Sequence, residues 1–113
     1  MSKNKGKDYS ASQESDIARM LGGRVQSNSG GTRFGGGDVL TKAFFIEAKT
    51  PTKDQTSFSV KKEWIDKMRE QAFEQGRYHC ALAFRFAPDG EDYFVISSKL
   101  MEELVYLLEE GES

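Results

Sequence analysis

The chain has 113 residues, of which 37% are hydrophobic and 30% charged, and its net charge is −2. This length and balance fit one globular domain and leave no room for a second. The sequence lacks an apolar run of the about 20 residues that a membrane helix needs, and its lysine-rich start lacks the apolar stretch of a signal peptide. We therefore expect a cytoplasmic protein. The single cysteine, Cys80, cannot form an internal disulfide and is expected to be a buried core thiol.

The charge is unevenly divided along the chain. Residues 1–62 hold 11 Lys and Arg against 6 Asp and Glu, whereas residues 63–113 hold 5 against 12. A phosphate-binding surface could form from the first half, with the acidic end of the chain turned away from it. A simple solvated acidic face explains the same distribution without a nucleic-acid partner.

Hydrophobic periodicity and turn residues predict the order helix, three strands, helix, two strands, helix. Residues 1–9 are expected to form a flexible basic arm, and residues 10–113 a single domain. The first helix is predicted from Ser10, in capping-box spacing with Gln13, to Leu21, ahead of the Gly22-Gly23 stop. Strands are predicted over residues 24–26, 38–40 and 43–49.

In the second half, a helix is predicted over about residues 60–75, capped by Ser59 and closed by Gly76. Strands over residues 78–86 and 92–97 are predicted to form a hairpin. The last helix, over residues 98–110, has an apolar stripe that we expect to lie in the core: Leu100, Met101, Leu104, Val105 and Leu108. Together these elements predict an α/β fold with a mixed central sheet of about five strands flanked by helices.

Two charged residues, Glu47 and Lys49, end an otherwise apolar strand and emerge on one face of it, because strand side chains alternate. If Asp38 lies on the adjacent strand, its carboxylate reaches Glu47, and two close carboxylates repel unless a proton or a cation lies between them. Oxygen ligands of this kind suit Mg²⁺, with Mn²⁺ as a substitute. The backbone carbonyl of Ala48 is a further candidate ligand. The alternative is a plain surface ion pair between Glu47 and Lys49.

Such a metal would activate a water for phosphodiester hydrolysis, with Lys49 positioning that water or stabilising transition-state charge. Glu14 precedes Ile17, Ala18 and Leu21 by three, four and seven residues, so it shares their apolar helical stripe. It either reaches solvent at the helix end or points into the same site. We count Glu14 with Asp38, Glu47 and Lys49 as candidate catalytic residues.

Several polar residues are candidates for DNA contacts. The segment 27–37 holds five of the 11 glycines and is either a flexible loop or a backbone that approaches a phosphate closely. Residues around the start of the second predicted helix either bind phosphate there or only cap it. Phe58 and Trp64 are expected to pack inside the protein or at an interface rather than to stack on bases. The candidates for DNA binding are Ser27, Ser29, Arg33, Lys53, Ser57, Lys61 and Lys62.

Gly37-Asp38 followed by Glu47-Ala48-Lys49, with Glu14 on a preceding helix, resembles the PD-(D/E)XK nuclease superfamily. Within it, nearly the whole chain is similar to the Holliday junction resolvases of archaeal type, including phage-encoded ones. Ser27 or Ser29 matches a serine of that family, whereas Gly37 replaces the proline of the motif. The resemblance implies a restriction-endonuclease-like core and a homodimer that cuts four-way DNA junctions by paired nicks with Mg²⁺, without a small-molecule cofactor or a membrane. A nuclease that nicks or cuts linear duplex and a non-catalytic DNA-binding module on a nuclease fold are the alternatives.

Overall fold

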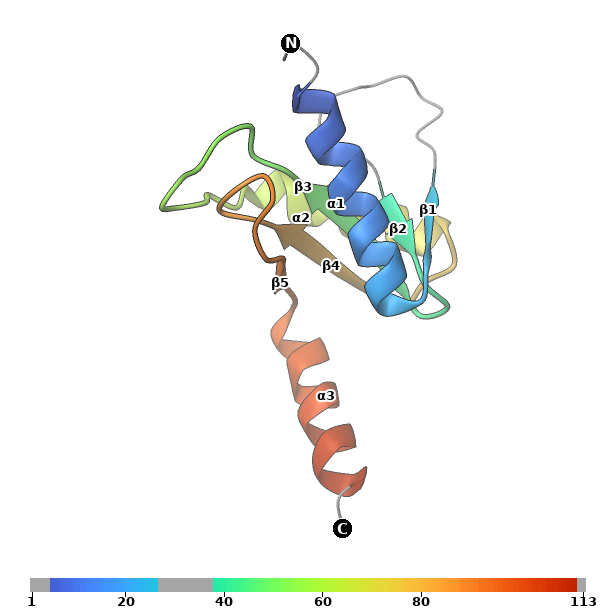
Figure 1. Ribbon diagram of the computed structural model, residues 1–113. Coiled ribbons are helices and arrows are strands. Elements are labelled where there is room, and N and C mark those ends of the chain that lie inside the picture. The colour runs from blue at the N-terminus through green and yellow to red at the C-terminus, as the bar shows by residue number, and fades with distance from the viewer. Residues whose placement is uncertain (1–4, 27–37, 112–113) are drawn as a thin grey trace.

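The computed structural model describes residues 5–26 and 38–111, with the backbone alone for residues 5–8. This part of the chain forms three helices and one mixed sheet of five strands (Figure 1). The α/β class and the order of elements predicted from the sequence are confirmed. None of the described helices is long and apolar enough to cross a membrane.

The elements follow one another as α1 (Lys5–Leu21), β1 (Arg24–Gln26), β2 (Asp38–Leu40), β3 (Phe44–Lys49), α2 (Lys62–Glu74), β4 (His79–Phe84), β5 (Tyr93–Val95) and α3 (Ser98–Gly111). The strands lie in chain order across the sheet. β3 and β4 run parallel, and the other neighbouring pairs run antiparallel. α2 provides the crossover that a parallel pair requires.

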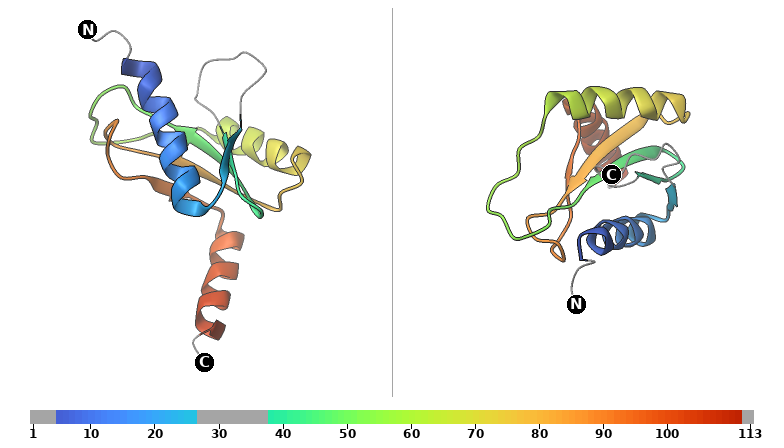
Figure 2. Two further views of the ribbon diagram at one scale, coloured as in Figure 1. Left: turned by 45° about the vertical axis from the view of Figure 1, so that its right-hand side comes forward. Right: turned by 90° about the horizontal axis from the view of Figure 1, so that it is seen from above.

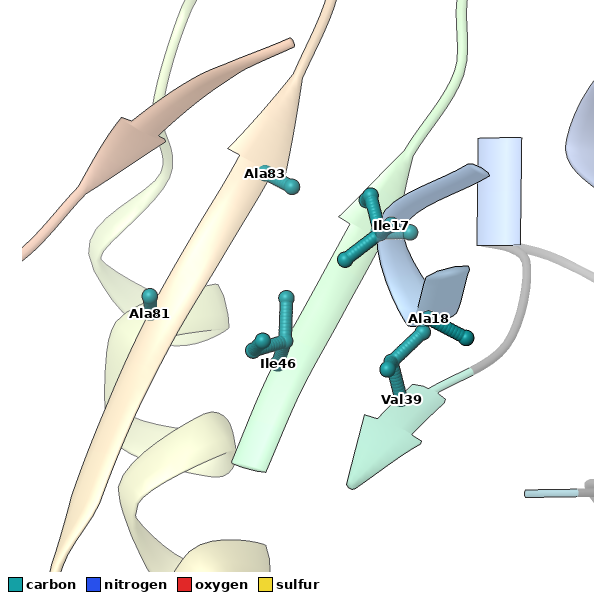
Figure 3. Close-up of a cluster of buried hydrophobic side chains, with 7 residues drawn as sticks. Ile17, Ala18, Val39, Ile46, Ala81 and Ala83 are labelled. Carbon is teal, nitrogen blue, oxygen red and sulfur yellow. The ribbon is translucent and has the colours of Figure 1, made fainter. Parts of the chain in front are cut away.

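Helices α1 and α2 cover opposite faces of the sheet (Figure 2). On the α1 face, Ile17 and Ala18 pack against Val39, Ile46 and small side chains of β4 (Figure 3). The close approach of α1 depends on those small residues, Ala81 and Ala83 among them, because a larger side chain would fill the space that Ile17 occupies.

On the α2 face, Met68 and Ala72 of the helix pack against Phe45 and Leu82. Side chains two residues apart share a face of a strand. Glu47 and Lys49 are in step with Phe45, so both extend from β3 on the α2 face, at the strand's carboxyl end.

Helix α1 begins at Lys5, so the prediction of a start at Ser10 was wrong, and residues 5–9 of the expected arm are helical. Residues 1–4 lie outside the described part of the chain. Ser10 does not cap the helix. Its hydroxyl donates to Glu14 Oε2 at 3.3 Å, one turn further on. The predicted end is confirmed: Gly22 has a φ of +72°, and the Gly23 N–H donates to the Ala18 carbonyl at 2.8 Å.

Helix α2 begins at Lys62, and Lys61 occupies the cap position in an extended conformation. Ser59 therefore does not cap this helix as predicted, because the backbone turns helical only after Lys61. Gly76 ends the helix as expected, with a φ of +74°. Both strands of the hairpin are shorter than predicted. β4 leaves out Tyr78, Arg85 and Phe86, and β5 leaves out Asp92, Ile96 and Ser97.

The apolar stripe of α3 is not part of the core, contrary to the sequence prediction. Leu100 is buried and Leu104 partly so, but Met101, Val105 and Leu108 are exposed. The reason is the direction of the helix, which leaves the end of β5 and runs away from the sheet (Figure 1). Leu21 of α1, also expected on a buried stripe, is exposed as well.

Candidate active site

Asp38 and Glu47 face each other across the β2–β3 pair. The antiparallel register places Asp38, the first residue of β2, directly opposite Glu47, and directly opposed side chains lie on the same face of a sheet. A hydrogen bond joins the two carboxyl groups. The contact proposed from the sequence for these two acids is therefore present in the structure.

The carboxyl pair holds a proton more tightly than isolated acids do. Burial raises the pKa of Asp38 to about 7, with further contributions from the charge and the hydrogen bond of Glu47 and from the charge of Glu14. Burial also raises the pKa of Glu47, and Lys49 is the main group that opposes this. Two acids this close either share a proton or require a cation between them.

Lys49 extends beside the carboxyl pair at the end of β3. Its ammonium nitrogen lies 3.6 Å from Glu47 Oε2 and 4.3 Å from the centre of the Trp64 ring. The side chains of Lys49 and Glu47 are only 17% and 18% exposed. Contact with an aromatic face and with a carboxylate keeps the ammonium in one place at the edge of the site. A loose surface ion pair would be far more exposed to solvent.

Glu14 reaches the same region from α1. It is 9% exposed, and its charge raises the pKa of Asp38, so it does not simply extend into solvent at the helix end. In residues 5–26 and 38–111, no three His, Cys, Asp or Glu side chains converge closely enough to hold a metal ion together. The structure thus brings Asp38 and Glu47 into contact and adds Glu14 through its charge. The Ala48 side chain is buried in the α1 layer of the core.

A third oxygen-bearing side chain lies in the same row of the sheet. Gln26 of β1 is the register partner of Asp38. Among the described residues, its amide oxygen is the buried side-chain atom that has no hydrogen-bond partner. An orphaned buried acceptor next to a carboxyl pair, together with the oxygen-rich character of the set, fits a hard cation such as Mg²⁺.

A buried polar network, which the sequence analysis missed, supports the end of β3. The Gln13 side chain is 0% exposed; it accepts a hydrogen bond from the Thr50 hydroxyl and donates to Asp92 Oδ1 at 2.9 Å. Asp92 in turn forms two 2.9 Å contacts with the guanidinium of Arg85. Gln13 lies four residues before Ile17, and this spacing was the available sign that it faces inward rather than capping a helix.

The DNA-contact candidates are distributed around the connection from β3 to α2. Lys53, Ser57 and Lys61 are exposed, as is Lys62, which pairs with Asp66 at 2.8 Å. The Gln55 N–H donates to the carbonyl of Phe86 at 2.8 Å, so this connection is held against the end of β4. Ser27, Ser29 and Arg33 lie outside the described residues.

Two aromatic residues of this region pack inside the protein, as expected. Phe58 stacks on Phe84 with 4.4 Å between ring centres, and Trp64 lies 6.0 Å from Phe58. Both contact the α2 layer of the core. The aromatic cluster therefore forms a rigid wall beside Lys49.

Comparison of the chain with known protein families, with characterised proteins and with solved structures finds no match.

Proposed function

We propose that this protein is a metal-dependent endonuclease that hydrolyses phosphodiester bonds of DNA at the Asp38–Glu47 site. The observation that carries the proposal is the pairing of two carboxyl groups across β2 and β3, with the ammonium group of Lys49 3.6 Å from one of them. A protein that only binds DNA has no need to hold two acids together against their mutual repulsion. A hydrolytic site that recruits a cation does need them.

Asp38 and Glu47 would hold Mg²⁺ or Mn²⁺, with the carbonyl of Ala48 as a further ligand and Glu14 adding negative charge beside them. Such an ion supplies a Lewis acid for a phosphate oxygen and lowers the pKa of a bound water. Lys49 then holds a positive charge where negative charge develops on the phosphate, and its contact with Trp64 keeps it there without reorganisation. The partly buried wall of Phe58 and Trp64 limits water on this side of the site.

The substrate that we propose is branched DNA, in particular a four-way junction that is cut by paired nicks. The support is the resemblance of Asp38, Glu47-Ala48-Lys49 and Glu14 to the junction resolvases of the PD-(D/E)XK superfamily, on an α/β fold with a mixed sheet. A restriction-endonuclease-like core for this sheet is part of the same proposal. Exposed cations near the site, Lys53 and Lys61, would contact the phosphate backbone.

The test is a cleavage assay on a four-way junction and on a linear duplex with the same arms, in Mg²⁺, in Mn²⁺ and in EDTA. We expect nicking of the junction that EDTA abolishes, no nicking by Asp38→Asn or Glu47→Gln, and normal nicking by Glu91→Gln, an exposed acid outside the site. Unchanged cutting by both site variants would overturn the site assignment. Equal cutting of the linear duplex would replace junctions by duplex DNA as the substrate, and DNA binding without Mn²⁺ binding would favour a non-catalytic module.

A further inference from the structure

Helix α3 exposes a large apolar surface. Four of its apolar side chains are 38–68% exposed: Met101, Val105, Leu107 and Leu108. At about 100° per residue they fall on one side of the helix together with Leu100 and Leu104, whereas Glu102 and Glu109 fall on the other. The helix is therefore amphipathic, and most of its apolar side contacts nothing else in the described chain.

The position of α3 makes this exposure costly. The helix runs away from the sheet and lengthens the molecule to 54 Å, against 30 and 27 Å in the other directions (Figures 1 and 2). A helix of 14 residues is only marginally stable in water unless its apolar side is packed. A continuous apolar surface of this kind marks an interaction site.

A groove of about 990 Å³ lies between α2, β4, β5 and the first turn of α3. Its floor is apolar and contains Ile65, Met68 and Val95. Two aromatic side chains at its border, Phe73 and Tyr78, are 84% and 97% exposed. The groove thus offers an apolar floor and two unpacked aromatic rings next to the base of the helix that lacks a packing partner.

The charges around the groove complement those of the helix. Three cations, Arg69, Arg77 and Lys99, line the groove, against one carboxylate, Glu103. Away from its apolar side, α3 has one cation, Lys99, and four carboxylates: Glu102, Glu103, Glu109 and Glu110. An acidic amphipathic helix that enters this groove would bury apolar side chains on its floor and place carboxylates near the cations of its rim.

We propose that the occupant of the groove is α3 of a second copy of this chain. Each copy has both the helix and the groove, so a two-fold exchange of helices satisfies both surfaces of both copies and closes the assembly at two. At 1.5 Å per residue, α3 is about 21 Å long, and the groove runs beside its base, so the partner helix packs against α2 and the first turn of α3. The residues of this interface lie outside the nuclease site, and its test does not depend on DNA cleavage.

The primary test is the association state of the full-length chain, measured by sedimentation equilibrium over a concentration series. We expect a dimer for the unaltered chain. Leu107→Asp and Leu108→Asp should raise the dimer dissociation constant by at least about 30-fold, as removal of a central apolar contact does. Tyr106→Asp is the matched control, since Tyr106 is 63% exposed but lies on the acidic side of the helix. It adds the same charge and should leave the dimer intact.

A second pair of measurements tests the groove. Phe73→Asp should weaken the dimer as strongly as Leu108→Asp does. Cys80 lines the groove, so its alkylation should be slower in the dimer than in the Leu108→Asp variant at the same pH. All the substituted residues are solvent-exposed in the single chain, and circular dichroism should confirm that every variant is folded.

A monomeric unaltered chain, or a dimer that survives both leucine substitutions, overturns the proposal. A dimer that Phe73→Asp leaves unchanged, with Cys80 unprotected, overturns it too, because the helices would then associate outside the groove.

Discussion

Asp38 lies directly opposite Glu47 in the β2–β3 register, and a hydrogen bond links their carboxyl groups in a partly buried position. The pair explains why the sequence interrupts an apolar strand with charge. Two acids in one row of a sheet oppose folding at neutral pH unless a proton or a cation relieves their repulsion. The site therefore lowers the stability of the cation-free protein.

Asp38→Asn should stabilise the cation-free protein at neutral pH while abolishing the proposed activity. The pKa of Asp38 is about 7 in the folded chain, against 3.8 for an unperturbed aspartate. The unfolded chain therefore releases this proton as pH rises above about 4, whereas the folded chain retains it until about 7, and stability falls over that interval. Asparagine can donate to Glu47 without ionising. We expect the free energy of unfolding of the variant to be about 1–2 kcal/mol higher at pH 7.5. The gain is smaller than the full pKa shift would give, because the carboxyl group is partly solvated.

Urea unfolding in EDTA between pH 4 and pH 8 measures this gain. The two proteins should have similar stability near pH 4 and diverge as pH approaches 7. Glu91→Gln, at an exposed position, should follow the unaltered protein throughout. Curves for Asp38→Asn and the unaltered protein that stay parallel over the whole range would contradict a shared proton at this site.

Gln13→Leu should destabilise the fold and impair cutting, although Gln13 is remote in sequence from the carboxyl pair. Its side chain is buried and bonds both Thr50, the residue after Lys49, and Asp92. Loss of the amide leaves two partly buried polar groups with fewer partners, at a cost of about 1–3 kcal/mol. Because Thr50 fixes the end of β3, the turnover at saturating DNA should fall while the affinity for DNA changes little.

Thr50→Val tests the same contact from the other side and should reproduce the loss of turnover. Ser12→Ala, next to Gln13 but exposed, is the control for a change in α1. The assays are run at a temperature at which all variants are folded. Normal turnover by both Gln13→Leu and Thr50→Val would show that this network stabilises the fold without positioning the site.

The contrast between Gln13 and Asp38 shows what the sequence could predict here. The Asp38–Glu47 contact follows from local information, since a short turn at Thr41–Ala43 joins two strands and sets their register. Gln13 depends on Thr50 and Asp92, which are 37 and 79 residues away, and a local pattern contains no such information. The pattern of Ser10 and Gln13 fitted a capping box; the spacing from Gln13 to Ile17 indicated an inward face, but only the tertiary structure gives Gln13 its two partners.

Helix α3 shows a second limit. Its periodicity correctly predicted an amphipathic helix with the bounds that the structure has, to within one residue at its end. The same pattern does not say whether the apolar side packs against its own sheet or against another chain. That outcome depends on the direction in which the chain leaves β5, which no residue of the helix determines.

Arg85→Met should strongly destabilise the fold, by about 3–5 kcal/mol, because it leaves a buried carboxylate unpaired. The side chains of Arg85 and Asp92 are 3% and 6% exposed and in contact. Arg85 also donates to the carbonyl of Pro88 at 2.9 Å and to Asp16. The hydrogen bond with Asp92, and after it the one with Asp16, raises the pKa of Arg85. Thermal or urea unfolding measures the loss.

The double variant Arg85→Met with Asp92→Asn is the informative comparison. Removal of the unpaired charge should recover part of the lost stability, since the penalty arises from the orphaned carboxylate. Arg19→Met, which removes the exposed partner of Asp16, should cost little. Equal losses for the single and double variants would mean that the network contributes through packing rather than through charge.

Lys61→Gln should weaken DNA binding and reduce the slope of log affinity against log salt by about 1, because each phosphate contact releases a counterion. Lys61 is exposed at the start of α2, with its ammonium 5.6 Å from the Trp64 ring, which the Lys49 ammonium also contacts. Lys62→Gln should have a smaller effect, since the Lys62 ammonium already pairs with Asp66 at 2.8 Å.

Lys42→Gln is the control: Lys42 is also exposed, but it lies in the turn before β3, at the opposite end of that strand from Lys49. Fluorescence anisotropy with a labelled four-way junction over a salt series measures all three slopes. If Lys42→Gln lowers the slope as much as Lys61→Gln does, DNA does not bind preferentially at the carboxyl end of β3, and the proposed nuclease site would lose its nearest phosphate contact.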